Sequence, residues 1–332
     1  MKRRQAIKII SLSTLLNCSR EGIDTSLNPE DNDNKPKPSR FTLVSPLKND
    51  PYAIWTPSLK VLYCESNYFK IVDQLGSELS DILVLGDDEG KSISNPNWVG
   101  ENIVYTINNT LENTSEIWKR YAYGGIPQKL GFGLPEGKYE YPAISSDEKL
   151  IAFTFNKEIY LSSYPIKGKA THIEPDDIGG LDSWSRWTGM YDWSLDGRLA
   201  LTIQTETTNI YIMEDIKLKN DNTIDVSSIK LRKLTSGNFI DNNPSWSSDC
   251  SYIAFDSERG TVDNERNIFL IKSDGTNLEN LTEKTTSDLK NLTIGSFCYT
   301  YPKFHPFDDA LIHSSRFVAN WAIHLIKNPT GY

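Results

Sequence analysis

The chain has 332 residues, of which 24% are charged and 38% are hydrophobic, and its formal net charge is −9. An acidic chain repels nucleic acid and has no general attraction to anionic membrane surfaces, so we expect neither as a partner. Aromatic residues make up 11%, with 20 glycines and 16 prolines, which favours many short strands over long helices. The four cysteines have neither the number nor the spacing of a disulfide framework or a metal-binding pair.

The amino terminus has the pattern of an export signal. Residues 1–17 begin with a basic cluster and continue into an apolar stretch that is too short to span a bilayer. The residues Leu15-Leu16-Asn17-Cys18 resemble the end of a bacterial lipoprotein signal, and this resemblance implies lipidation at Cys18. Arg3-Arg4 also resembles a twin-arginine signal, so the export route stays open. A cleaved secretory signal with an incidental cysteine is the alternative.

The segment 19–40 is predicted to be a disordered tether. It contains almost no apolar residues and is rich in Pro, Asn, Asp and Ser, so it cannot bury enough surface to fold. The expected organisation is an export signal over 1–18, the tether over 19–40 and one folded domain over 41–327. This layout predicts a monomeric lipoprotein of the bacterial cell envelope, either periplasmic or on the surface.

Six copies of one short pattern fill the rest of the chain. Each copy has a large apolar residue, a polar turn and a β-rich triplet, as in NPSWSSDCSYIAFDS at 243–257. The large apolar residue, called the anchor below, is in successive copies Trp55, Trp98, Ile144, Trp193, Trp246 and Phe304. The spacing between anchors grows from 43 to 58 residues, close to the length of one propeller blade. We expect nearly every anchor tryptophan to fill the space between blades.

Two further strands follow in most copies. The third strand is predicted at Phe69-Val72, Ile117-Tyr121, Ile159-Leu161, Ile210-Met213, Ile268-Ile271 and Ala322-Ile326. The fourth is predicted at Ile82-Leu85, Lys129-Leu130, Thr171-Ile173, Leu231-Thr235 and Leu281-Thr282. Asp196-Gly197 and Asp274-Gly275 suit tight hairpins, because Gly accepts positive φ. The pattern predicts an all-β fold, a six-bladed β-propeller of four-stranded antiparallel blades.

The sixth copy lacks a fourth strand after Ile326. Phe41-Thr42-Leu43-Val44 offers a substitute, because Leu43 precedes Trp55 by twelve residues, as Leu234 precedes Trp246. We therefore expect the amino-terminal strand to complete the last blade and close the ring. Closure hides strand edges that an open array would expose.

The fullest copy, NPSWSSDCSYIAFDSERG followed by NIFLIKSDGTNLENLT, resembles the repeat of the TolB-type propellers. The resemblance covers roughly residues 41–327 and is most specific in copies three to six. It implies a bacterial periplasmic protein. TolB itself is implied to have an α/β domain before its propeller, where this chain has only the predicted tether. The chain therefore resembles a propeller-only, lipoprotein-like relative.

Catalytic motifs are not recognised in the sequence. It has no nucleophile elbow, phosphate loop or HExxH motif, and serine-protease chemistry is not expected. Oligogalacturonate lyases resemble this propeller class and are implied to hold a metal through histidines near the central channel. His305, His313 and His324 fall in the sixth copy, the last two on neighbouring strands. Because no carboxylate set completes a metal site, we expect structural histidines and neither a metal nor another cofactor.

Residues 174–191 form the candidate ligand-binding segment, which is longer than its equivalents in other copies. Its candidate contact residues are Trp184, Arg186, Trp187 and Tyr191. Aromatic faces beside the carboxylates of this segment suit a sugar ring or a peptide. Tryptophans buried under a folded loop are the alternative.

Arg259 and Arg316 follow the second strand of adjacent copies and should lie on one face. They could grip a partner's carboxylate, or be held by neighbouring acidic residues instead. Taken together, the sequence favours a non-enzymatic scaffold that binds an envelope protein or a glycan. A metal-dependent carbohydrate-active enzyme resembling oligogalacturonate lyase is the alternative.

Overall fold

The computed structural model describes residues 39–330, apart from 48–51, 85–89, 175–185, 261–264, 283–296, 306–308, 318–319 and a few single positions. Cys18 and nearly all of the predicted tether lie outside this part of the chain. Ser39 and Arg40, which we expected in the tether, belong to the first strand. Within the described ranges, no helix is long and apolar enough to cross a membrane.

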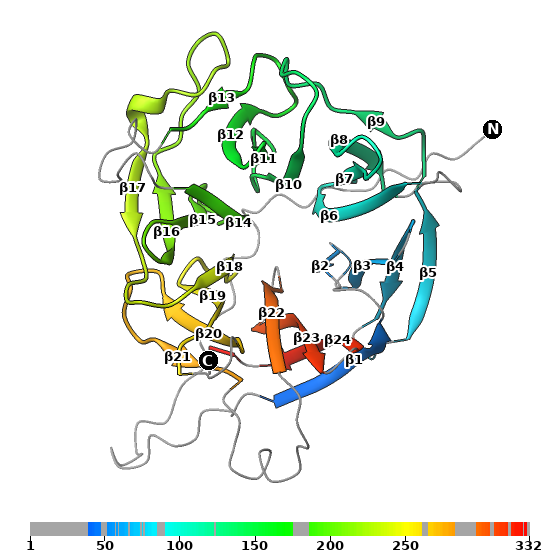
Figure 1. Cartoon of the computed structure of the whole chain (residues 1–332), viewed down its shortest axis with the longest axis vertical. Coiled ribbons are helices and arrows are strands. Elements are labelled where there is room, and N and C mark those ends of the chain that lie inside the picture. The colour runs from blue at the N-terminus through cyan, green and yellow to red at the C-terminus, as the bar shows by residue number, and fades with distance from the viewer. Residues whose placement is uncertain are drawn as a thin grey trace, which may run out of the picture. The chain divides into compact units, whose positions relative to one another are not determined.

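Six four-stranded antiparallel sheets surround a central channel, each with its first strand innermost (Figure 1). The six-bladed β-propeller predicted from the repeats is confirmed. Blades 1 to 3 contain β2 (Ala53–Trp55), β3 (Val61–Glu65), β4 (Tyr68–Val72) and β5 (Glu78–Leu83); β6 (Lys91–Val99), β7 (Asn102–Asn109), β8 (Thr114–Tyr121) and β9 (Gln128–Lys129); and β10 (Tyr139–Ile144), β11 (Leu150–Phe155), β12 (Glu158–Ser163) and β13 (Thr171–His172). Blades 4 to 6 contain β14 (Arg186–Trp193), β15 (Leu199–Gln204), β16 (Thr208–Glu214) and β17 (Lys230–Lys233); β18 (Asp241–Trp246), β19 (Tyr252–Ser257), β20 (Asn267–Lys272) and β21 (Glu279–Asn280); and β22 (Phe297–Phe304), β23 (Ala310–Phe317) and β24 (Asn320–Lys327).

The first strand closes the ring as predicted. β1 (Ser39–Leu47) pairs antiparallel with β24 and is the outermost strand of blade 6, blue beside red in Figure 1. Leu43 and Leu47 are buried in a cluster with Ile312 and Ile323 of the same blade. Closure therefore rests on both backbone pairing and apolar burial.

The fourth strands differ most from prediction. β5 begins at Glu78 rather than Ile82, and β21 covers Glu279–Asn280 rather than Leu281-Thr282. Outer strands have one edge facing solvent, and β9 is fully exposed. Apolar residues are therefore a weak guide to where an outer strand begins.

A shift in pairing register marks a β-bulge in the innermost strand of five blades, and four of these bulges share one backbone feature. Asn95, Tyr141, Asn243 and Tyr301 have φ between 50° and 54°, and the pairing register shifts beside each of them. Each stands three residues before its anchor and is followed by proline, which has no N–H to pair. The innermost strands are thus kinked at the same distance from the anchor.

Candidate functional site at the channel mouth

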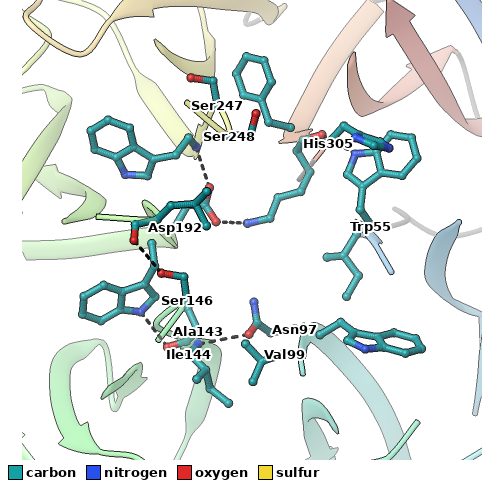
Figure 2. A pocket seen from close by; sticks show the side chains of 17 residues that line it. Trp55, Asn97, Val99, Ala143, Ile144, Ser146, Asp192, Ser247, Ser248 and His305 are labelled. Atoms are coloured by element: carbon teal, nitrogen blue, oxygen red, sulfur yellow. Dashed lines mark hydrogen bonds and ion pairs between the residues drawn. The ribbon is translucent and has the colours of Figure 1, made fainter. Parts of the chain in front are cut away.

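The ends of the innermost strands enclose a cavity of about 240 Å³, called the channel mouth below (Figure 2). One anchor from each blade lines it, namely Trp55, Trp98, Ile144, Trp193, Trp246 and Phe304. Five of these side chains are buried, as predicted, and Trp98 is partly exposed. Ser146, Leu195, Ser247 and Ser248 add turn residues to the lining. The repeat that builds the fold therefore also builds the mouth.

A belt of hydrogen bonds connects neighbouring blades around the mouth. At three junctions the side chain just before one anchor accepts a hydrogen bond from the backbone N–H of the next blade's anchor. The three bonds are Asn97 Oδ1 with Ile144 N (3.2 Å), Asp192 Oδ2 with Trp246 N (2.7 Å) and Ser245 Oγ with Phe304 N (3.0 Å). Because these N–H groups lie on an unpaired strand edge, each bond satisfies a donor that the sheet leaves open.

Indole N–H groups connect two further junctions. Trp55 Nε1 donates to the Lys303 carbonyl of blade 6 at 3.1 Å, and Trp193 Nε1 donates to the Ala143 carbonyl of blade 3 at 3.0 Å. Trp98 differs, because its Nε1 donates to the Gly100 carbonyl of its own blade at 3.0 Å. Two anchor rings are thereby fixed across a blade junction, whereas the Trp98 ring is fixed within its blade.

An ion pair lies inside the mouth. Lys303 of blade 6 extends to Asp192 of blade 4, which is labelled in Figure 2. The other carboxylate oxygen of Asp192 accepts hydrogen bonds from Ser245 and Trp246. The two side chains are 15% and 14% exposed. Burial opposes the charged form of the lysine, but Asp192 and Tyr52 hold the pKa of Lys303 above its ordinary value. Lys303 therefore keeps its proton beside Asp192.

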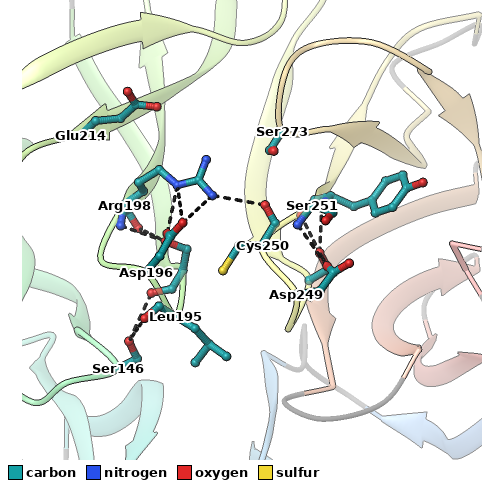
Figure 3. Close-up of polar contacts among 12 residues, drawn as sticks. Ser146, Leu195, Asp196, Arg198, Glu214, Asp249, Cys250, Ser251 and Ser273 are labelled. Atoms are coloured by element: carbon teal, nitrogen blue, oxygen red, sulfur yellow. Dashed lines mark hydrogen bonds and ion pairs between the residues drawn. The ribbon is translucent and has the colours of Figure 1, made fainter. Parts of the chain in front are cut away.

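The rim turns are held together by side-chain bonds (Figure 3). Arg198 donates to both carboxylate oxygens of Asp196 and, at 3.2 Å, to the Cys250 carbonyl of the next blade. Its guanidinium lies 4.5 Å from the centre of the Trp246 ring. Ser146 donates to the Leu195 carbonyl at 3.2 Å. Turns from blades 3, 4 and 5 therefore form one preorganised rim.

The predicted ligand-binding segment is only partly described. Tyr191 lies in β14, is 3% exposed and shares a hydrogen bond with Thr154. Burial raises its pKa, so the hydroxyl stays protonated. Arg186 and Trp187 belong to the same strand, but their side chains and all of Trp184 lie outside the described residues. The ring of Tyr191 thus belongs to the core, and the other three remain predictions.

Arg259 is held by an acidic neighbour. It donates to Asp241 Oδ2 at 2.5 Å and to the Ser236 carbonyl at 2.8 Å, and it lies over the Phe239 ring at 4.6 Å. Asp241 is fully buried, so this ion pair fixes the end of blade 5. Arg316 belongs to β23, and its side chain is not among those described.

The histidines of blade 6 occupy two places. His313 and His324 are opposite residues in the backbone pairing of β23 and β24, the neighbouring strands on which they were predicted. His305 is buried in the wall of the mouth, with its ring 4.5 Å from that of Trp55. Among the side chains that the structure describes, no three His, Cys, Asp or Glu residues are grouped so that they could hold a metal ion.

Comparisons with known proteins support the fold. No protein-family model matches the sequence, and no curated protein matches it. The TolB structure from Agrobacterium tumefaciens is 20% identical, with a TM-score of 0.50, over 71% of this chain and 76% of that one. TolB from Acinetobacter baumannii is 16% identical, with a TM-score of 0.52, over 84% of this chain and 65% of that one.

The fold of an enzyme is equally similar. Oligogalacturonate lyase from Vibrio parahaemolyticus is 13% identical, with a TM-score of 0.52, over 85% of this chain and 79% of that one. Likenesses at such low identity concern the fold and not the chemistry. The closed ring of six sheets and these neighbours together show that the chain has the six-bladed β-propeller fold of the TolB structures.

Proposed function

We propose that the protein is a non-enzymatic binding scaffold of the bacterial cell envelope, anchored by a lipid on Cys18 and extended by the tether over 19–40. Its ligand, a segment of an envelope protein or a glycan, enters the channel mouth. The observation that carries this proposal is the cavity of about 240 Å³ to which all six blades contribute an anchor. A rigid ring of repeats with one concave site is a typical arrangement for binding.

A protein segment suits the chemistry of the mouth best. Its walls combine four indole rings, one phenyl ring and several aliphatic side chains, and three serines line it. The innermost strands present unpaired backbone edges to the channel, which can hydrogen-bond an inserted chain. A cavity of this size holds a chain end or one or two projecting side chains, not a folded domain. Tethering raises the effective concentration, so modest affinity is sufficient.

Occlusion of the mouth tests this proposal. The export signal and tether are replaced by an affinity tag, and the protein is used to capture partners from envelope extract. Ser248→Trp adds a large ring at the partly exposed mouth lining and should lower the yield of captured partner at least about tenfold. Glu206→Trp, on the exposed turn between β15 and β16, is the matched control and should capture normally. Equal capture by both variants, with equal melting temperatures, would refute binding at the mouth.

The predicted loop residues offer a second contact with the same partner. Trp184→Ala combined with Trp187→Ala should weaken capture without shifting the melting temperature, because rings that contact a ligand are not needed for folding. A large fall in melting temperature would instead identify them as core residues. Four other residues remain candidates, namely Arg186, Tyr191, Arg259 and Arg316. Tyr191 and Arg259 rank lowest, because Tyr191 is buried and Arg259 is paired with Asp241.

A metal-dependent carbohydrate-active enzyme is the second candidate. It is favoured by His305 in the wall of the mouth and by the lyase among the structural neighbours. Elemental analysis of the purified protein, with a screen for unsaturated products from acidic polysaccharides, separates the two functions. The scaffold proposal predicts no product, and product release that stops on chelation would overturn it.

A further inference from the structure

Two cavities lie between blades 1 and 2, at a place called the blade 1–2 junction below. The smaller, about 520 Å³, is lined by residues of both blades, among them Ile82, Trp98 and Arg120. The larger, about 780 Å³, is lined by Val84 of blade 1 and by blade 2 residues that include Tyr105 and Trp118. Cavities of several hundred Å³ are in the range that binds small organic ligands.

Among the tryptophans whose burial the structure describes, the two that are partly exposed lie at this junction. Trp55, Trp193 and Trp246 are buried, whereas Trp98 and Trp118 are not fully covered. Trp98 lines the smaller cavity and Trp118 the larger one. Both indoles pack against the apolar cluster shared by blades 1 and 2 and keep part of their surface uncovered, so each combines a fixed ring with an accessible apolar surface.

Both indoles are held in fixed orientations. Trp98 Nε1 donates to the Gly100 carbonyl at 3.0 Å, and Trp118 Nε1 donates to Glu116 Oε2 at 2.9 Å. The other oxygen of Glu116 pairs with Lys129. Because the N–H edge of each ring is already hydrogen-bonded, the orientation of the ring is fixed. A ligand that packs on the ring face therefore costs little further side-chain entropy.

An unused hydroxyl borders the larger cavity. Tyr105 faces Trp118 across β7 and β8 and is fully buried, and its hydroxyl has no hydrogen-bond partner among the described residues. Burial raises the pKa of Tyr105 to about 12, so the hydroxyl keeps its proton and can donate. A buried polar group without a partner is costly unless a water or a ligand supplies one.

The charges around both cavities are balanced. Lys60, Arg120 and Asp81 line the smaller cavity, and Lys91, Glu112 and Glu116 line the larger one. The smaller cavity thus has two cations and one anion and the larger has one cation and two anions, so a ligand that spans both gains no net attraction from a charge of either sign. A purely apolar ligand would cover these charges without replacing their hydrogen bonds. A neutral ligand with many hydroxyl groups avoids both penalties.

We infer that the blade 1–2 junction binds a neutral oligosaccharide. One sugar ring packs its C–H face on Trp118 in the larger cavity, where the Tyr105 hydroxyl and the charged rim meet its hydroxyl groups. Trp98 offers a second stacking surface in the smaller cavity. The site shares Trp98 with the lining of the channel mouth, whereas Tyr105 and Trp118 do not belong to that lining.

Calorimetric titration of the purified propeller tests this inference with three probes: maltotriose, cellotriose and triacetylchitotriose. At least one should bind, and Trp118→Ala should weaken its binding at least about tenfold. Tyr121→Ala is the matched control, because Tyr121 is 53% exposed on the same strand and lines neither cavity. The absence of binding by all three at millimolar concentration would overturn the inference, as would equal binding by Trp118→Ala.

Two further variants keep the test decisive if Trp118→Ala folds poorly. Tyr105→Phe removes only the unpaired hydroxyl and should weaken binding by roughly threefold to tenfold, since it deletes one hydrogen bond. Ser248→Trp should leave sugar binding unchanged, and loss of binding in that variant would place the sugar at the channel mouth instead. Tighter binding of trigalacturonate than of the neutral probes would contradict the requirement for a neutral ligand.

Discussion

The junctions around the channel mouth and the blade 1–2 junction are built differently. Asn97, Asp192 and Ser245 each stand just before an anchor and accept a hydrogen bond from the next blade. Ile54 holds the same position in blade 1, where its aliphatic side chain cannot accept one from the N–H of Trp98. Cavities of about 520 and 780 Å³ lie at that junction.

The indoles repeat this contrast. Trp55 and Trp193 each donate to a carbonyl of the preceding blade, whereas Trp98 donates within its own blade. The junction between blades 3 and 4 lacks an acceptor side chain, because Ala143 stands there, but its backbone carbonyl serves instead. The residue before each anchor thus influences how a blade is joined to the next. Where Ile54 stands, blades 1 and 2 are joined by apolar packing, with Ile54 in one buried cluster with Ile103 and Tyr105.

Deletion of residues 41–44 tests the closed ring on which the comparison rests. It removes three of the six residues of β1 that pair with β24, together with the buried side chain of Leu43. Because blade 6 would lose its outer strand, we expect the loss of most of the folding free energy, which is about 5–15 kcal/mol in a typical domain. Urea unfolding followed by circular dichroism should show a broad transition. A sharp, unshifted transition would contradict closure by β1.

Asp192→Ala should give the next largest effect. It leaves Lys303 unpaired in a confined site and removes the acceptor of the Trp246 N–H, for an expected loss of about 3–5 kcal/mol in unfolding free energy. Ile54→Val changes the same position of blade 1 and should cost only about 0.5–1.5 kcal/mol. If chemical denaturation finds the two variants equally stable, the belt does not hold the blades together.

The turns should give the smallest effect, visible as a dependence on pH. Partial burial favours the protonated form of Asp196, but hydrogen bonds from Arg198 and Ser194 hold the pKa of that carboxyl below its ordinary value. Its contribution is therefore present above about pH 4 and is lost as the pH falls through the lowered pKa. The corresponding turn of blade 1 uses Ser58, whose hydroxyl lies 3.1 Å from that of Thr56 and does not titrate in this range.

The free energy of unfolding, measured at pH 7 and at pH 3, tests this difference between the two turns. Asp196→Asn should reduce the acid-induced loss of stability slightly, whereas Ser58→Ala should shift stability by the same amount at both values. An Asp196→Asn protein with an unchanged pH dependence would show that the turn carboxylate contributes nothing to acid sensitivity.

Much of the fold could be predicted because each repeat carries a large apolar anchor. Burial of one such side chain per blade requires a fixed place for it, so the six anchors set the register of all sheets. The distance from each anchor also predicted the third strands and the closing strand β1. It failed for β5 and β21, which begin earlier than predicted, since outer strands bury little apolar surface.

The site was less predictable, because its contacts join residues of different blades. The sequence predicted contact residues within the single segment 174–191. The ion pair of the mouth instead joins Asp192 and Lys303, which are 111 positions apart in the chain. A signal was present: Asn95-Pro96, Tyr141-Pro142, Asn243-Pro244 and Tyr301-Pro302 recur three residues before an anchor. Proline in an innermost strand marks a bulge at an unpaired edge, and therefore the approach to the channel.

The pairing of β1 with β24 has a consequence for the order of the chain. Ser39 stands opposite Lys327, so the first and last residues of the ring are neighbours, within about 5 Å between Cα atoms in such a pairing. A short linker could join them, and new termini could be opened at the exposed turn after Gln204. The resulting circular permutant would keep every blade contact while moving the chain ends to blade 4, because a ring of like units has no intrinsic starting point.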